Sequence, residues 1–193
     1  MMMTLQEAKL LNAIKYFVKN TNNVGRTKLF KLLYFWDFRF FEKHGKSITD
    51  LQYFTYPFGP VPDKLYNEIK EDKLPSYLND DLVFEDSQEF DEDNEFKPFK
   101  VLLRDKKIDM AVFTPYEEEA LKEVAYIFKD ATASEMTEAS HIHNSPWSKT
   151  LKEKGRFQEI DYFLAKSEST PYDDEEIRER MFLRENLLHN DYD

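Results

Sequence analysis

The chain has 193 residues, of which 41% are hydrophobic and 16% aromatic, and it contains no cysteine. This composition argues against a disordered protein, and the lack of cysteine excludes disulfides and thiolate metal sites. The formal net charge of −11 at pH 7 does not favour binding to nucleic acid, because phosphate neutralisation requires a basic surface.

The acidic residues are concentrated in two segments. Residues 79–95 contain nine acidic residues and no basic one, and residues 167–193 contain nine acidic residues and three arginines. Such runs are typical of solvated segments, and they can also steer a basic partner. Since no apolar run reaches the length of a membrane span and no signal peptide is visible, we expect a cytoplasmic protein without a membrane partner.

The first two predicted helices differ in how much of their surface is apolar. A capping box formed by Thr4 and Glu7 begins the first helix, and residues 21–25 end it. The second helix begins at Arg26 and has two apolar stripes, which predicts a helix running through the middle of the core. The stripes consist of Leu29, Leu32, Leu33, Trp36 and Phe40, and of Phe30, Tyr34, Phe38 and Phe41.

Asp37 stands out in the second helix because its helical neighbours are apolar. It lies outside the polar strip of that helix, which carries Lys28 and Lys31. A buried carboxylate needs hydrogen-bond partners. We therefore interpret Asp37 as a residue that ties a nearby turn together, with a catalytic role as the alternative.

The segment after this helix is extended and rich in proline. Gly45 is expected to end the helix in the left-handed conformation. Residues 51–56 favour a short strand, and residues 57–62, with three prolines around Gly59, favour a stiff turn. A helix is expected from residue 63 to about residue 71.

The middle of the chain predicts a loop and a hairpin. Residues 73–81 are expected to form a loop. Residues 82–84 and 100–103 have the composition of two strands, with the acidic run as their connection. If residues 51–56 joined them, one small antiparallel sheet would result.

The last part of the chain favours helices. Capping patterns place helix starts at Thr114 and Thr132. Residues 144–147 predict a turn, and residues 151–164 are weakly helical. A third helix start at 170–173 opens an acidic helix with Ile177, Met181 and Leu188 at helical spacing. The fold class predicted is mainly α (α+β): a compact helical domain around one central apolar helix, with a small antiparallel sheet.

No motif for catalysis, for a metal or for a cofactor is recognisable. His141 and His143 are two residues apart and do not belong to a His-Glu-x-x-His pattern. A nucleophile elbow, a P-loop and a dinucleotide-binding fingerprint are absent from the sequence. We therefore expect no catalytic residue, no metal and no cofactor. A hydrolase using Asp37 and His141 and a transcription regulator are the alternatives from other classes.

Three elements in order resemble a known family. Residues 28–37 read Lys-Leu-x-Lys-Leu-Leu-Tyr-Phe-x-Asp, Gly59-Pro60-Val61 precedes a helix, and His141 is followed by Pro146-Trp147. Over about residues 5–151 the chain resembles the Panacea domain of SocA-like antitoxins. We accordingly expect a Panacea-like domain over residues 1–166 and an acidic C-terminal helix or tail over residues 167–193.

The resemblance implies a function that the composition alone does not indicate. Panacea proteins are generally antitoxins that neutralise a toxin encoded by a neighbouring gene through direct contact, and toxic small alarmone synthetases are among the known partners. The expected mechanism is occlusion of the active site of the toxin in a hetero-oligomer. One branch of the family delivers its toxin to a protease, and this adaptor function is the alternative. The two acidic segments are not part of the family pattern.

The candidate site residues fall into two groups. Basic and aromatic residues near the motifs are candidates for binding the partner: Lys28, Lys31, Tyr56, Phe58 and Trp147. For the aromatic ones, packing over the end of the central helix is the alternative. Residues assigned a structural role are Asp37, Gly59, Pro60 and His141. We expect His141 to donate a hydrogen bond to Asp37 or to a carbonyl in the turn at Gly59.

Overall fold

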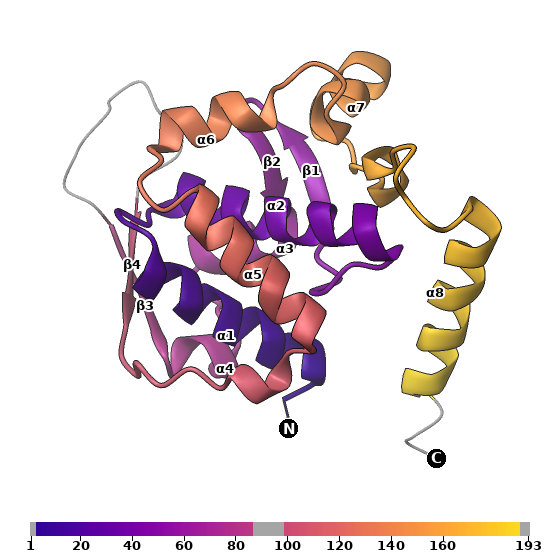
Figure 1. Cartoon of the computed structure of the whole chain (residues 1–193). Coiled ribbons are helices and arrows are strands. Elements are labelled where there is room, and N and C mark those ends of the chain that lie inside the picture. The colour runs from indigo at the N-terminus through magenta and orange to yellow at the C-terminus, as the bar shows by residue number, and fades with distance from the viewer. Residues whose placement is uncertain (1–2, 87–98, 190–193) are drawn as a thin grey trace.

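The computed structural model describes residues 3–86 and 99–189. Helix α2 (Arg26–His44) lies at the centre, as the two apolar stripes predicted, and helices and strands from both halves of the chain pack on it (Figure 1). Leu29, Leu32, Leu33 and Trp36 are fully buried. The helices around it are α1 (Leu5–Asn20), α3 (Asp63–Lys70), α4 (Ser76–Asn79), α5 (Pro115–Ile127), α6 (Ala133–Ser140), α7 (Pro146–Lys154) and α8 (Asp174–His189).

Local sequence signals set most helix boundaries. The side chains of Thr4, Thr114 and Thr132 each accept a hydrogen bond from the backbone N–H three residues on. The carboxylate of the glutamate at that position accepts a hydrogen bond from the backbone N–H of the threonine. These capping boxes satisfy N–H groups that the first turn of a helix leaves unpaired. Gly45 has a φ of 64°, the left-handed conformation expected after α2. Helix α4 lies in a segment expected to be a loop, and this expectation was wrong.

The strands form two separate hairpins, in contrast to the single sheet that was considered. Strands β1 (Tyr53–Tyr56) and β2 (Gly59–Pro62) pair antiparallel, with Tyr53 opposite Pro62. The stiff turn expected over residues 57–62 was therefore wrong, because only Pro57 and Phe58 turn the chain. Proline lacks an N–H donor and is tolerated in an edge strand, and β2 is such a strand.

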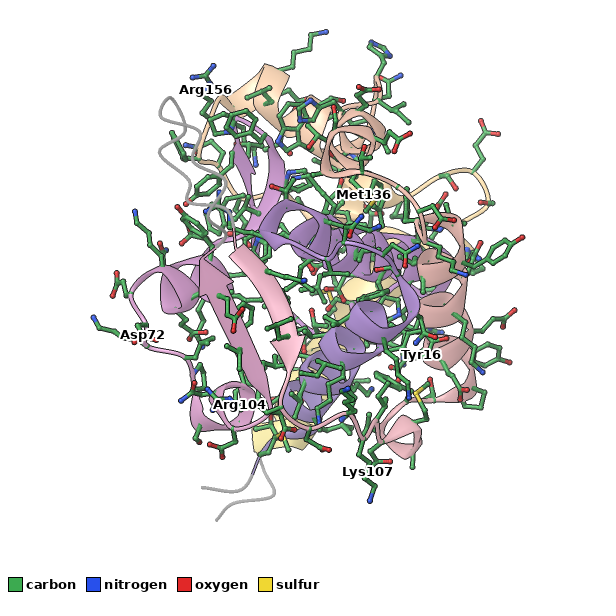
Figure 2. All side chains as sticks on the ribbon, turned by 90° about the vertical axis from the view of Figure 1, so that its left-hand side faces the viewer. Tyr16, Asp72, Arg104, Lys107, Met136 and Arg156 are labelled. Atoms are coloured by element: carbon green, nitrogen blue, oxygen red, sulfur yellow. The ribbon has the colours of Figure 1, made fainter. Side chains whose placement is uncertain are left out.

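The second hairpin was predicted correctly at both strands. Strands β3 (Leu82–Asp86) and β4 (Phe99–Leu103) pair antiparallel, with Leu82 opposite Leu103. The acidic connection between them lies outside the described residues. Figure 2 shows this hairpin in front of the N-terminal helices, and Leu82 and Val101 contribute to the core.

Residues 151–164 were expected to be weakly helical, but they do not form one helix. Helix α7 ends at Lys154, and Gly155 turns the chain with a φ of 90°. The chain then runs beside β1, where the N–H of Thr55 donates to the Gln158 carbonyl over 2.9 Å and the N–H of Ile160 donates to the Tyr53 carbonyl over 2.8 Å. A short 3₁₀ helix (Tyr162–Ala165) follows. The turn expected at 144–147 already includes the first residues of α7.

The acidic helix predicted at the C-terminal end is α8, which lies at the side of the molecule (Figure 1). It begins after Asp173, the last residue of the predicted start at 170–173, and Asp173 exchanges hydrogen bonds with Glu176. Ile177 is fully buried and lies against Gly45. Arg184 pairs with Asp50 at 2.8 Å. No helix in the described part of the chain is both long and apolar enough to cross a membrane.

Candidate functional site

The motif residues meet where α2, β2 and the junction of α6 and α7 come together. We call this region the hairpin corner, and it is built from Lys31, Gly59, Pro60, Ser140, His141 and Trp147. Helix α2 supplies the lysine, β2 the glycine and proline, and the short helices α6 and α7 the remaining side chains. Residues far apart in the sequence are thus held in one small volume.

Lys31 is the central side chain of the hairpin corner. It is only 1% exposed, and its Nζ donates a hydrogen bond to the carbonyl oxygen of Pro60 over 3.0 Å. Burial lowers the pKa of Lys31 to about 7, because the charged ammonium group loses its hydration. The hydrogen bond ties the central helix to the edge strand.

Gly59 makes this close approach possible. Its φ of 101° is one that residues with a side chain rarely adopt. A Cβ atom at this position would lie 2.6 Å from Lys31 Nζ and 2.7 Å from Ser140 Oγ. Glycine is therefore required both by the backbone conformation and by the space available.

His141 and Trp147 form the side of the hairpin corner that lies next to β1. Their rings stack with centroids 3.8 Å apart and planes within 8° of parallel. The indole Nε1 of Trp147 donates to the Tyr56 carbonyl over 3.3 Å. Among the described residues, the buried Nε2 of His141 has no hydrogen-bond partner. The hydrogen bond expected from His141 to Asp37 or to a turn carbonyl is thus absent there, because ring stacking holds the imidazole instead.

Asp37 lies elsewhere on α2 and fixes the segment that leads into β1. Its Oδ1 accepts hydrogen bonds from the N–H groups of Ile48 (2.9 Å) and Thr49 (3.0 Å), and its Oδ2 accepts from the Tyr53 hydroxyl at 2.9 Å. The side chain is fully buried, and burial raises its pKa to about 6 even though these donors favour the charged form. This geometry is the turn-tying role predicted for Asp37.

Lys28 is also buried, at 1% exposure. Its Nζ donates to the backbone carbonyls of Asn22 (2.8 Å), Lys129 (3.0 Å) and Ala131 (2.7 Å). The ammonium group therefore joins the loop before α2 to the end of α5. The polar strip of α2 is therefore buried at Lys28 and Lys31, because α2 is covered on more sides than its two apolar stripes indicated.

The aromatic candidates differ in how accessible they are. Trp147 is 6% exposed and Tyr56 is half-buried, so both pack over the hairpin. Phe58, at the turn between β1 and β2, is 53% exposed. A contact of these residues or of the two lysines with a partner remains a prediction, and among these candidates Phe58 is the exposed one.

Some polar contacts of the core were not predicted. Lys9 and Glu117 form a buried ion pair at 2.8 Å, and the buried Nζ of Lys15 pairs with Asp81 at 2.6 Å. The only sequence signal for them is a lysine on or beside the apolar face of α1. Each pair joins residues more than sixty positions apart, which local patterns do not reveal.

The described residues do not assemble a recognisable catalytic group. Asp37 and His141, the pair considered for a hydrolase, have separate partners at separate ends of β1. No group of three or more histidine, aspartate or glutamate side chains in the described part of the chain is arranged to hold a metal ion. The arrangement is suited to holding the hairpin rigidly against α2.

A comparison with known families gives the corner its context. The model of the family described as "Antitoxin SocA-like, Panacea domain" matches residues 29–148. The chain belongs to this family. The matched range of the Panacea domain includes Lys31, Asp37, Gly59, His141 and Trp147, and it leaves α1 and α8 outside. Neither the curated proteins nor the solved structures that were compared gave a match.

Proposed function

We propose that this Panacea protein is an antitoxin that neutralises a cognate toxin by binding it directly and covering its active site. The observation that carries the proposal is the family match over residues 29–148. The geometry supports it, because the motif residues hold the hairpin and the segment after α2 in place. They do not form a recognisable catalytic group among the described residues. The protein then acts by complementarity, without making or breaking a bond.

The contact surface we propose is centred on the turn between β1 and β2. Phe58 lies at this turn and is 53% exposed, and large aromatic side chains are frequent anchors in protein interfaces. The hairpin behind it is held by Lys31 through Pro60 and by Trp147 through Tyr56. A rigid support lowers the entropy lost when a partner binds.

Charge favours a basic partner surface. The chain carries a net charge of −11, and the first turn of α8 contributes three exposed acidic residues, Asp174, Glu175 and Glu176. Complementary charge raises the rate of association and disfavours other partners. We therefore expect complex formation to weaken as the salt concentration rises.

Co-expression with the product of the neighbouring gene tests the proposal. The two proteins should purify together, and growth of cells that express the gene product should be restored. Phe58→Ser should weaken the complex, while Tyr126→Ser, a change at an aromatic residue that is 84% exposed on α5, should leave it intact. A gene product that remains toxic and does not co-purify would overturn the proposal. Restored growth with a shortened half-life of the gene product would indicate the adaptor alternative.

A further inference from the structure

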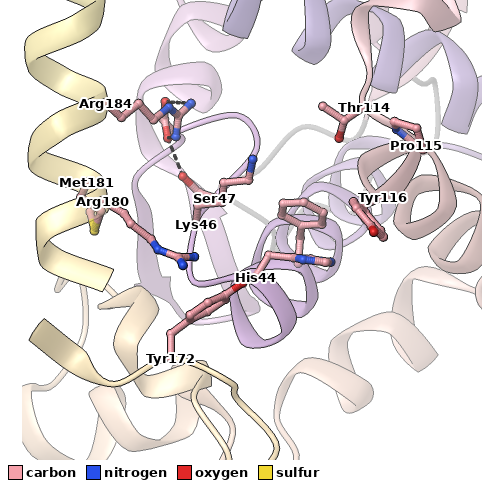
Figure 3. Close-up of a pocket in the computed structure, with 12 residues that line it drawn as sticks. His44, Lys46, Ser47, Thr114, Pro115, Tyr116, Tyr172, Arg180, Met181 and Arg184 are labelled. Carbon is pink, nitrogen blue, oxygen red and sulfur yellow. Dashed lines mark hydrogen bonds and ion pairs between the residues drawn. The ribbon is translucent and has the colours of Figure 1, made fainter. Parts of the chain in front are cut away.

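A cavity lies between α8 and the body of the protein, away from the hairpin corner. It has a volume of about 640 Å³ and is bordered by α8, by the segment of residues 45–50 and by the start of α5 (Figure 3). We call it the α8 cleft. Its volume lies in the range of about 300–1,000 Å³ that is usual for sites binding small molecules.

Cations gather around this cleft although the protein is strongly acidic. Lys46, Arg180 and Arg184 line it, and Asp50 is the carboxylate among the lining residues. Both terminal nitrogens of Arg184 donate to Asp50, at 3.1 and 2.8 Å, so that charge is balanced. Within the described chain, Lys46 and Arg180 form no ion pair. Two positive charges thus remain at the cleft for a ligand.

Aromatic rings form the other part of the lining. The guanidinium of Arg180 lies over the Tyr172 ring, 3.8 Å from its centroid. The His44 ring lies between Phe40 (4.3 Å between centroids) and Tyr116 (5.3 Å), and Tyr116 is 64% exposed. Such surfaces can stack on a planar ring.

The electrostatic environment of His44 agrees with a positive site. Burial lowers the pKa of His44, and the charges of Lys46 and Lys43 lower it further. The nearest buried acid of α5, Glu117, is paired with Lys9. The charges of Glu117 and Glu119 act on the His44 pKa in the opposite direction, and their effects are smaller than those of the two lysines.

We propose that the α8 cleft binds a nucleotide, with its phosphates at Lys46 and Arg180 and its base against the aromatic rings. Two adjacent unpaired cations suit a ligand with more than one phosphate, because each contributes a charge-assisted hydrogen bond. The exposed Tyr116 ring, which is tilted by 41° to the His44 ring, offers a face on which a base can stack. This inference is independent of the proposed toxin binding.

Calorimetric titration of the full chain at low salt tests the proposal, with ATP, tripolyphosphate, adenosine and a hexaglutamate peptide as probes. ATP should bind about tenfold more tightly than tripolyphosphate, since stacking adds to the phosphate contacts, and adenosine alone should bind weakly. Lys46→Gln and Arg180→Gln should each weaken ATP binding about tenfold. Both side chains are exposed, so the variants should keep the melting temperature of the parent protein.

Matched controls exist on the same elements. Lys43 pairs with Glu123 at 3.2 Å, and the Arg178 guanidinium lies over the Phe163 ring at 4.5 Å; neither lines the cleft. Lys43→Gln and Arg178→Gln should change the affinity for ATP less than about twofold, because only screened charge is lost. The proposal is overturned if ATP does not bind, if all four variants weaken binding equally, or if tripolyphosphate or hexaglutamate binds as tightly as ATP.

Discussion

Lys31 Nζ lies 3.0 Å from the carbonyl oxygen of Pro60 and donates a hydrogen bond to it inside the protein. This one contact joins the central helix to a strand that begins 33 positions after the helix starts. The Lys31 side chain passes close to Gly59, where the lack of a Cβ atom leaves space for it. It also sets a buried, titratable amine at the base of the hairpin that carries Phe58. The stability of the hairpin should therefore depend on pH.

Lys31→Met should change how the free energy of unfolding depends on pH. The pKa of Lys31 is lowered to about 7 from 10.5, so between these values the unfolded chain binds more protons than the folded one. Stability therefore rises with pH across this window and is lost as pH falls toward 7. The variant should lack this slope, which amounts to at most about 1.4 kcal/mol per pH unit.

Denaturant unfolding at pH 7, 8 and 9 measures this effect. Lys64→Met is the matched control, since the Lys64 side chain is 86% exposed. Equal slopes for the parent protein and Lys31→Met would contradict a buried amine at the corner.

Asp37→Asn should remove a pH dependence of stability that has the opposite sign and lies at lower pH. The pKa of Asp37 is raised from 3.8 to about 6, so its contribution to stability is fully present below pH 3.8 and is lost as pH rises through 6. The loss amounts to about 3 kcal/mol for a shift of about two units. Asparagine stays neutral and can still accept from the backbone N–H groups, so Asp37→Asn should unfold with little dependence on pH between 4 and 7.

Asp37→Ala separates charge from hydrogen bonding. It leaves the N–H groups of Ile48 and Thr49 and the Tyr53 hydroxyl without their acceptor, and it should lower the free energy of unfolding by about 3 kcal/mol or more. Melting curves of both variants at pH 7 provide the comparison. If Asp37→Asn were as unstable as Asp37→Ala, the charge itself would hold the turn.

Gly59→Ala should destabilise the protein more than Gly155→Ala. Both glycines have a positive φ, so alanine is strained at both, by about 1–3 kcal/mol. At Gly155 no atom lies within 4 Å of the added Cβ, whereas at Gly59 the Cβ would overlap Lys31 and Ser140. We expect an additional loss of about 1–3 kcal/mol for Gly59→Ala, measured by chemical denaturation. Equal losses for the two variants would show that Lys31 and Ser140 can move away from the added methyl group at no cost, which would contradict a tightly packed hairpin corner.

Much of the fold was predictable from local patterns. Capping pairs such as Thr132 with Glu135 fix helix starts through contacts three residues apart. The apolar stripes of α2 predicted its central place, and the family motif predicted that Gly59 and Asp37 have structural roles. These features are encoded over short stretches, where spacing alone decides the conformation.

Other features depend on contacts that a single stretch does not contain. Strand β2 forms despite two prolines because β1 supplies a partner on one side only, as an edge strand allows. Residues 158–160 run alongside β1 because their backbone pairs with that strand, about 100 positions earlier. Lys28 and Lys31 are buried because distant carbonyl groups receive their ammonium groups. The α8 cleft was missed for the same reason.

The measurement that tests the central claim most directly is a titration of the purified product of the neighbouring gene with this protein, followed through the toxic activity of that product. Direct occlusion predicts that the activity falls to the background at about one equivalent, without protease and without turnover of any substrate by this chain. Activity that persists at a large molar excess of this protein, in solution conditions that preserve both folds, would contradict the account.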